Sequence, residues 1–159
     1  MKGKLLSIFF VSVFSGIIAN AQDVAPNQLD EQGRKTGQWK TYYENGSPKY
    51  EGFFHKGNPQ GRFKRYYNGG ILQAEMNFLS DGKTAYAKLY YQNGKVAAEG
   101  KYVNMKKDST WKYYSFYNGR HAISENYNMD RRHGITRKFY DNAGLAEEKA
   151  WVNDTLHGL

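Results

Sequence analysis

The sequence contains no cysteine, which limits both how the chain is held together and what it can bind. None of its 159 residues is Cys, so no disulfide can stabilise the fold and no thiolate can serve as a metal ligand. Stability has to come from side-chain packing instead. The material for that packing is aromatic, since the chain has 14 Tyr, 9 Phe and 3 Trp.

Long apolar runs are absent except for one at the N-terminus. Two lysines precede an apolar run over residues 5–18, which is followed by the small-x-small cleavage site Ala19-Asn20-Ala21. A run of 14 residues is shorter than the roughly 20 that a membrane-spanning helix needs. The sequence therefore predicts a signal peptide over residues 1–21. It also predicts a mature protein without a transmembrane span, exported to the periplasm, the cell surface or the medium.

A concentrated block of positive charge is also missing. The net charge is +8 at pH 7, and removal of residues 1–21 leaves 21 Lys and Arg against 15 Asp and Glu, or +6. These positive residues are spread along the whole chain, whereas a nucleic-acid-binding surface concentrates them. Together with the predicted export, this distribution argues against a nucleic-acid partner.

The organising feature is a repeat of 24 residues. Tyr42-Tyr43 recurs as Tyr66-Tyr67 and Tyr90-Tyr91, and Glu51 recurs at positions 75 and 99. Self-similarity at a fixed period indicates a stack of similar supersecondary units. We assign about five repeats with a partial sixth to residues 37–159. Residues 22–36 are polar and show no period, and we expect a flexible lead-in there.

Each repeat is predicted to be a β-hairpin. Short runs of Tyr, Phe, Trp, Thr and Lys are separated by Asn-Gly or Gly-Gly, the strongest short-range hairpin signal. With a two-residue turn at Asn45-Gly46, facing residues have numbers that sum to 91. In the fourth repeat, extra residues before and after Asn118-Gly119 are expected to compensate. This arithmetic predicts the cross-strand pairs Lys40–Glu51, Lys64–Glu75, Lys88–Glu99 and Lys112–Glu125, and Arg137–Glu148 if the fifth loop has four residues.

The predicted register divides the side chains between two faces. Facing residues point to the same side of a sheet, so one face of the first three repeats is apolar and includes Trp39 and Phe63. The other face carries the Lys and Glu pairs, with Tyr42, Tyr66 and Tyr90 between them. The predicted fold is all-β: an antiparallel meander of about ten short strands in an open, single-layer, twisted sheet.

Rows of aromatic residues form the candidate binding surface, whose predicted members are Tyr42, Tyr66, Tyr90, Trp39, Phe63 and Trp111. Two interpretations of the tyrosine column stay open. Rings in a row can stack on sugars or grip a peptide, and they can also shield the backbone of a single-layer sheet. We interpret the Lys and Glu pairs as structural, since facing opposite charges stabilise a sheet by roughly 0.2–1 kcal/mol each. Trp39 opposite Gly52 is interpreted as a ring that covers a bare glycine.

No arrangement of side chains suggests catalysis. The four histidines lack metal-ligand spacing, and Ser109 and Ser124 lack the glycine context of a nucleophile. The glutamates recur by repeat, which places them on successive hairpins about 10 Å apart, too far for paired acid catalysis. We expect no enzyme activity, no metal site and no cofactor.

The motifs Gly37-x-Trp39-x-x-Tyr42-Tyr43-x-Asn45-Gly46 and Glu51-Gly52-x-Phe54 resemble those of MORN-variant repeat proteins, a group often labelled as YwqK-type antitoxins of toxin–antitoxin systems. The resemblance covers about five repeats, from residue 33 to the end, and implies the hairpin-repeat fold. The third repeat departs from the pattern at Ala85 and Ala87, and the fourth at Ser109 and Asn126. For a protein with a signal peptide, an antitoxin role would require a toxin that is also exported.

The function expected from the sequence is binding. A single-layer sheet cannot hide an apolar face unless it curls strongly, and a large exposed apolar patch marks an interface. We therefore expect an exported, non-enzymatic scaffold that binds a protein, a second copy of itself or an envelope component through the apolar face. A glycan-binding or cell-wall-binding module that uses the tyrosine rows is the alternative.

Overall fold

A single antiparallel sheet makes up the described part of the chain. The computed structural model describes residues 25–158, so the predicted signal peptide lies outside the described residues. Between residues 25 and 158 there is no helix, and thirteen strands form the sheet. The strands are β1 (Gln28–Leu29), β2 (Lys35–Tyr42), β3 (Pro48–His55), β4 (Asn58–Tyr66), β5 (Leu72–Phe78), β6 (Thr84–Tyr90), β7 (Val96–Val103), β8 (Lys106–Tyr114), β9 (His121–Asn128), β10 (Arg131–Arg132), β11 (Gly134–Phe139), β12 (Leu145–Val152) and β13 (Thr155–Leu156).

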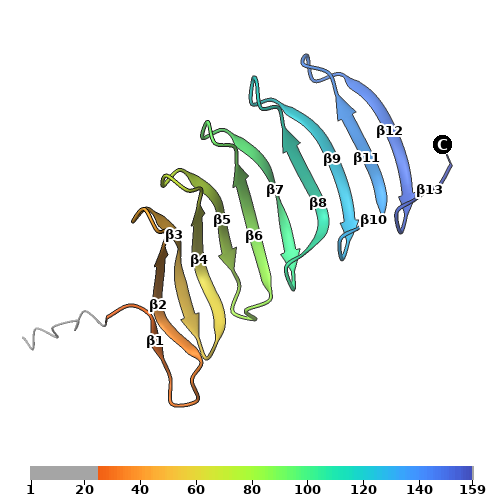
Figure 1. Ribbon diagram of the computed structural model, residues 1–159. Helices are drawn as coiled ribbons and strands as arrows, with labels where there is room; N and C mark the ends of the chain where they lie inside the picture. Colours follow the sequence, from red (N-terminus) through yellow and green to blue (C-terminus); the bar gives the residue numbers. More distant parts are fainter. Residues whose placement is uncertain (1–24, 159) are drawn as a thin grey trace, which may run out of the picture.

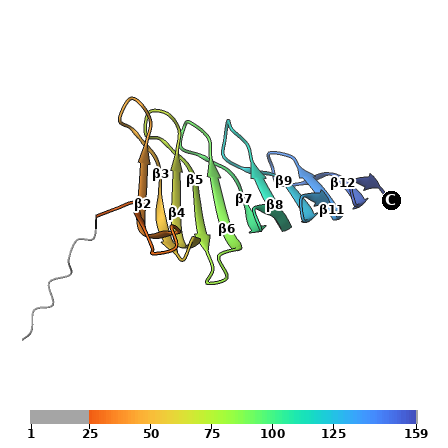
Figure 2. The same ribbon diagram turned by 60° about the horizontal axis from the view of Figure 1, so that its bottom comes forward.

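The ten longer strands form five hairpins, as the repeat predicts. The hairpins are β2–β3, β4–β5, β6–β7, β8–β9 and β11–β12, and they follow one another across the sheet in sequence order. The three remaining strands, β1, β10 and β13, have two residues each. Figures 1 and 2 show an open, twisted sheet with β2 near one end and β12 near the other. The hairpin turns follow one another along one edge (Figure 1), so equivalent positions of the repeats form rows.

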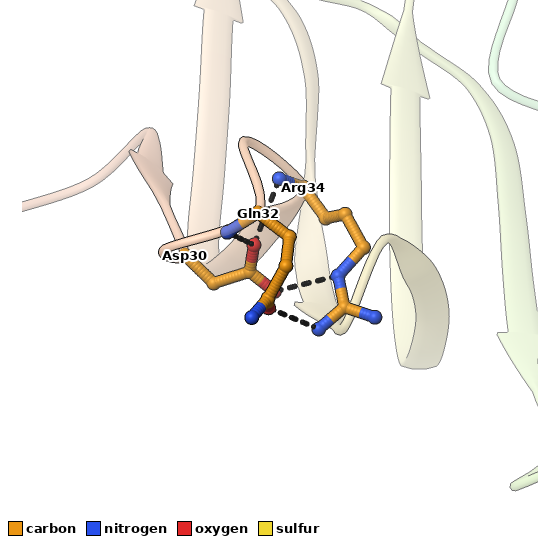
Figure 3. Close-up of polar contacts among 3 residues, drawn as sticks. All are labelled: Asp30, Gln32 and Arg34. Atoms are coloured by element: carbon orange, nitrogen blue, oxygen red, sulfur yellow. Dashed lines mark hydrogen bonds and ion pairs between the residues drawn. The ribbon is translucent and has the colours of Figure 1, made fainter.

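The described part of the segment expected to be a flexible lead-in, residues 25–36, contains β1 and the start of β2, which pair with each other in the sheet. The turn between these strands is built on Asp30. Its carboxylate accepts hydrogen bonds from the backbone N–H groups of Gln32 (3.0 Å) and Arg34 (2.9 Å) and from the Arg34 guanidinium (2.8 Å), as Figure 3 shows. The bond from the Arg34 backbone is the main cause that lowers the pKa of Asp30. This turn depends on local side-chain bonds, which a search for periods does not detect.

The hairpin turns are longer than predicted, yet the predicted register holds in the strands. In the first hairpin the Tyr43 N–H donates to the Ser47 carbonyl (2.9 Å), which closes a three-residue loop with Gly46 at φ 80°. A β-bulge at Lys49 then offsets the extra loop residue, because Tyr42 pairs with Pro48 but Thr41 pairs with Tyr50. The confirmed pairs are Lys40–Glu51, Lys64–Glu75, Lys88–Glu99 and Arg137–Glu148.

Two-residue turns occur instead at the opposite ends of the hairpin strands, except between β5 and β6, where the Leu79 N–H donates to the Thr84 carbonyl across a four-residue loop. Lys56-Gly57, Asn104-Met105, Met129-Asp130 and Asn153-Asp154 each join two strands directly, and both residues of each turn have positive φ. This is the geometry of a type I′ turn, whose twist matches that of the flanking antiparallel strands. The Asn-Gly signal predicts two-residue turns at the closed ends of the hairpins. In the structure, the two-residue turns lie at the opposite ends of the strands.

The predicted pair Lys112–Glu125 is wrong. The fourth hairpin has a four-residue loop (residues 116–119), one residue longer than the loops of the other hairpins. The extra residues around this turn do not compensate, so Lys112 pairs with Ser124, and Trp111 pairs with Glu125. A register shift of one residue moves every side chain to the opposite face of the sheet. Glu125 therefore lies on the face opposite to the other paired glutamates.

The core lies on one face of the sheet, which we call the aromatic face and define by Trp39, Phe63 and Trp111. The opposite face, defined by Lys40 and Glu51, is the charged face. Burial is deepest near the middle of the sheet, where the core residues are Phe63, Ala74, Phe78, Ala85, Ala87, Ala98 and Trp111. The core is thus made by neighbouring repeats and cannot be formed by one repeat alone.

Rings on the aromatic face pack over glycines of the preceding strand. A Cβ atom added to Gly52 would lie 2.4 Å from the Phe63 ring, and one added to Gly100 would lie 2.3 Å from the Trp111 ring. Trp39 does pair with Gly52 in register, but the ring over this glycine is that of Phe63 from the next hairpin. The prediction that Trp39 covers Gly52 is therefore corrected: the contact joins two repeats.

The order of small and large residues is reversed where the third repeat departs from the others: the large residue lies on the preceding strand and the small one on the third repeat. Met76 occupies the position that Gly52 and Gly100 hold in their repeats, and it pairs across strands with the small Ala87. Met76 packs against the buried clusters on both sides of it. Large and small residues have exchanged places across this pair, which conserves the filled volume.

Ala85 accounts for a second irregularity of the third repeat. The residues at this position in the neighbouring repeats, Gly61 and Ser109, have left-handed φ values of 65° and 61° and lie where the register shifts by two residues. Ala85 is not left-handed, and β5 pairs with β6 without a shift. The departure from the repeat motif therefore coincides with an uninterrupted register between β5 and β6.

Candidate functional site

The charged face carries a row of alternating charges that crosses seven strands. Each glutamate lies between two lysines of the neighbouring strands, in the order Lys40, Glu51, Lys64, Glu75, Lys88, Glu99 and Lys112. Ion pairs join Lys64 to Glu51 (3.5 Å) and Lys88 to Glu99 (3.8 Å). Alternation of this kind favours the pairing of each strand with both of its neighbours.

Tyrosine hydroxyl groups hold two of these glutamates. Tyr66 donates a hydrogen bond to Glu51 (2.7 Å), and Tyr114 donates one to Glu99 (2.6 Å). Burial, followed by the bond to the carboxylate, raises the pKa of each tyrosine to about 12. The Tyr66 hydroxyl is also the main cause that lowers the pKa of Glu51. Tyr66 therefore stabilises the ionised form of Glu51, and both tyrosines are tied to a carboxylate within the sheet.

The predicted tyrosine column differs in accessibility along its length. Tyr42 is 59 % exposed, whereas Tyr66 and Tyr90 are half-buried. Tyr66 is also restrained by its bond to Glu51. The column is therefore not a uniform platform of free rings, and Tyr42 is its most accessible member.

The predicted surface residues on the aromatic face are mostly core residues. Phe63 is 8 % exposed and Trp111 is fully buried, while Trp39 is half-buried and donates its indole N–H to the Gln28 carbonyl of β1 (3.1 Å). Edge-to-face contacts with centroids 5.1 Å apart link Phe54, Phe63 and Phe78. The middle of the aromatic face is thus covered by its own rings. The exposed apolar patch from which the sequence predicts an interface is therefore not formed by Phe63 and Trp111.

A groove lies on the charged face, over β5 to β8. Its volume is about 560 Å³, and the side chains that line it include Tyr86, Lys88, Glu99, Lys101 and Lys112. Tyr86 is 58 % exposed although it is aromatic. An exposed ring beside several ammonium groups suits a partner surface that combines apolar and negatively charged groups.

The row of alternating charges is interrupted at one end of this groove. Ser124 stands where the repeat would place a glutamate, between Lys112 on β8 and Arg137 on β11. Arg137 binds Glu148 (2.7 Å), whereas Lys112 keeps only one facing carboxylate, that of Glu99. Positive charge therefore exceeds negative charge beside Ser124.

The glutamate displaced from this row forms part of a box on the aromatic face. The Lys107 ammonium lies 5.0–5.2 Å from the ring centroids of Trp111, Tyr113 and Tyr127, and it donates to the Tyr113 hydroxyl (2.8 Å). The hydroxyls of Tyr113 and Tyr127 are 3.1 Å apart, and Tyr127 donates to Glu125 (2.5 Å). Burial first, and the bond to Glu125 second, strongly raise the pKa of Tyr127.

A second box lies three repeats earlier. The Lys35 ammonium is 4.4 Å from the Trp39 ring centroid, 5.6 Å from that of Tyr50 and 5.0 Å from that of Phe54, and it donates to the Tyr50 hydroxyl (3.1 Å). Its lysine is equivalent to Lys107, 72 residues later. Gly52 stands in the first repeat where Glu125 stands in the fourth, so this box has no carboxylate at that position.

Sequence reasoning missed Tyr86 and Lys107, and it placed Glu125 on the wrong face. Tyr86 lies outside the Lys and Glu pairs and the tyrosine column by which the sequence describes the charged face. The extra residue in the fourth turn was visible, but whether an insertion is offset by a bulge depends on backbone geometry. Without that knowledge Glu125 could not be placed on the aromatic face.

Comparison with known protein families supports the repeat assignment over part of the chain. Three segments, residues 35–56, 59–79 and 83–104, match the family model of the MORN repeat variant. They coincide with the hairpins β2–β3, β4–β5 and β6–β7. No curated protein matches the chain. MORN repeats are generally associated with binding to proteins or membranes, and among residues 25–158 no helix is long and apolar enough to cross a bilayer.

Proposed function

We propose that this chain, in which the first three of five hairpins match the MORN repeat variant, is an exported, non-enzymatic scaffold that binds a protein or envelope partner through its charged face. One observation carries the proposal: the groove over β5 to β8 displays an exposed Tyr86 next to Lys88 and Lys112. Aromatic residues are enriched at binding surfaces because they contribute a large contact area with few rotatable bonds.

The contrast between the faces supports this choice of surface. On the aromatic face, Phe63 and Trp111 are already buried against neighbouring strands. On the charged face, Lys112 is exposed and faces one carboxylate, that of Glu99, because Ser124 stands on its other side, whereas Lys64 and Lys88 within the row face a carboxylate on each side. A partner with acidic groups would balance this excess charge and would be attracted over a longer range.

The test is site-specific photocrosslinking in cells that export the protein. A photoreactive phenylalanine analogue at Tyr86 is expected to trap one defined adduct, to be identified by mass spectrometry. The same analogue at Arg65, an exposed position on the aromatic face, is the matched control and should trap no such adduct. Lys112→Glu should abolish the Tyr86 adduct without unfolding the protein. Equal crosslinking from both positions, or an adduct insensitive to Lys112→Glu, would refute the choice of the charged face.

The identity of the adduct tests the finer functional hypothesis. The resemblance to YwqK-type antitoxins predicts an exported toxin as the partner. Co-expression should then relieve the toxicity of that partner, and Lys112→Glu should restore the toxicity. A trapped surface-assembly protein would favour the scaffold without an antitoxin role.

A glycan-binding module remains the second candidate, favoured by the exposure of Tyr42 and Tyr86 on the same face. Rings stacked on sugar would make retention on peptidoglycan sensitive to Tyr42→Ala and Tyr86→Ala. Tyr66→Phe is the control, because it keeps the ring and removes the hydroxyl that binds Glu51. Retention that survives both alanine variants would exclude this candidate.

A further inference from the structure

The box around Lys107 has the composition of a receptor for a positively charged ligand. The Lys107 ammonium lies 5.2 Å from the Trp111 ring centroid and 5.0 Å from that of Tyr127, within the distance range of cation–π attraction, while Tyr113 presents its hydroxyl (2.8 Å). The lysine belongs to the same chain and enters from the start of β8, next to the turn at Asn104-Met105. The site is therefore occupied by a flexible side chain that is itself only half-buried.

The protein supplies the Lys107 ammonium with one hydrogen-bond acceptor in this box. A primary ammonium has three N–H donors, and among the described residues the Lys107 ammonium donates only to the Tyr113 hydroxyl. Glu125 is bonded to Tyr127 and forms no ion pair with Lys107 within the described chain. The protein groups of the box are thus ring faces, one hydroxyl that accepts from Lys107, and a nearby carboxylate.

A methylated ammonium suits these surroundings better than a primary one. It has no N–H groups that need acceptors, and its methyl groups contact ring faces directly, while the carboxylate of Glu125 balances its charge. We propose that the aromatic face of the fourth repeat is a binding site for quaternary ammonium groups, and that such a group enters by displacing Lys107. This site is separate from the groove on the charged face.

The box in the first repeat provides an internal comparison. It has the same lysine and three aromatic rings, but Gly52 stands where the fourth repeat has Glu125. Without a carboxylate, its attraction for a cation depends on the rings alone. The proposal therefore assigns the ligand to the fourth repeat and predicts weaker binding in the first.

The test follows the three indole N–H signals of the protein by NMR during titration with tetramethylammonium chloride. Sodium chloride at equal ionic strength is the reference. The Trp111 signal is expected to shift saturably in the millimolar range, while Trp39 responds more weakly and Trp151 serves as a distant probe. Lys107→Met should tighten binding about tenfold by removing the competing ammonium. Adding Glu125→Gln to that variant should reverse most of the gain.

Lys35→Met is the matched control, since it removes the ammonium from the box that lacks a carboxylate. In Lys35→Met, the affinity for tetramethylammonium read from the Trp39 signal should be weaker than the affinity read from the Trp111 signal in Lys107→Met. A Trp111 signal that does not move in the wild-type protein, or that moves equally with sodium chloride, overturns the proposal. So does binding that is unaffected by Glu125→Gln. If Lys107→Met does not fold, the wild-type titration alone decides.

Discussion

Glu99 and Glu125 end on opposite faces of the sheet, although both follow their hairpin turns at similar distances. Glu99 faces Lys88 and Lys112 on the charged face, whereas Glu125 faces Trp111 on the aromatic face. One extra residue in the turn before Glu125 separates the two cases. The same insertion leaves Ser124 in the row of alternating charges and adds a carboxylate to the box around Lys107.

Restoring the glutamate at the break in the row should stabilise the sheet. Ser124→Glu places a carboxylate between Lys112 and Arg137, and the expected gain in unfolding free energy is about 0.5 kcal/mol. Salt should reduce the gain, because charges on an open face are screened. Urea unfolding at low and high salt measures both effects. Ser124→Gln is the control of equal size, and an equal gain for it would contradict the electrostatic explanation.

Gly100, which lies under the Trp111 ring, should tolerate no larger residue unless Trp111 is also replaced. In Gly100→Met the added side chain meets the ring, and we expect a loss of about 1–3 kcal/mol in stability. Combining Gly100→Met with Trp111→Ala reproduces the arrangement of Met76 and Ala87, so the double variant should be more stable than the sum of the single effects predicts. A double-mutant cycle from urea unfolding measures this coupling. Additive effects would show that the two positions do not exchange volume.

Replacing Ser109 by glycine should stabilise the protein, because the Ser109 backbone is left-handed with φ 61°. The left-handed conformation costs a residue with a Cβ atom about 1–2 kcal/mol, and glycine avoids this cost. Part of the resulting gain in stability is offset because glycine makes the unfolded chain more flexible. Ser109→Gly is therefore expected to raise stability by roughly 0.5 kcal/mol. Ala85→Gly, at the equivalent position without left-handed backbone, should lower stability. Thermal unfolding of both variants gives the comparison, and changes of equal sign would contradict it.

Glu147 should titrate far below an ordinary glutamate. Hydrogen bonds from Lys138 (2.7 Å) and then Lys149 (2.5 Å) lower its pKa to about 2. A lowered pKa in the folded state stabilises the fold above the ordinary glutamate value, and this contribution is lost as the pH falls from there towards 2. NMR of the carboxyl carbon measures the midpoint. Lys138→Met should raise it, whereas the remote Lys112→Met should leave it unchanged.

The strand register could be predicted from the sequence because the charge pattern is redundant. Several pairs, such as Lys40 with Glu51, require the same register, and the predicted register holds even though the turn type was misassigned. A longer loop and a bulge displace the chain in opposite directions and cancel. In the fourth hairpin they do not cancel, so Lys112 and Glu125 were mispaired.

The candidate site was less predictable because its contacts join different repeats. Alternation along a strand gives the face of a side chain, but not the ring that covers it, so the sequence predicts Phe63 and Trp111 as surface residues although both are buried. Their burial depends on glycines of the preceding hairpin. The box around Lys107 likewise combines side chains of β8 and β9 in a register that the repeat pattern did not predict.

The exchange of size between Met76 and Ala87 means that the repeats are not interchangeable units. Deleting residues 61–84 would remove one full period but bring Ala87 over Gly52, leaving a void where a ring belongs. Deleting residues 85–108 would bring Trp111 against Met76, where there is no room for it. Each hairpin thus fits only the neighbour it has, and the order of the repeats is encoded in the shapes of their contact surfaces.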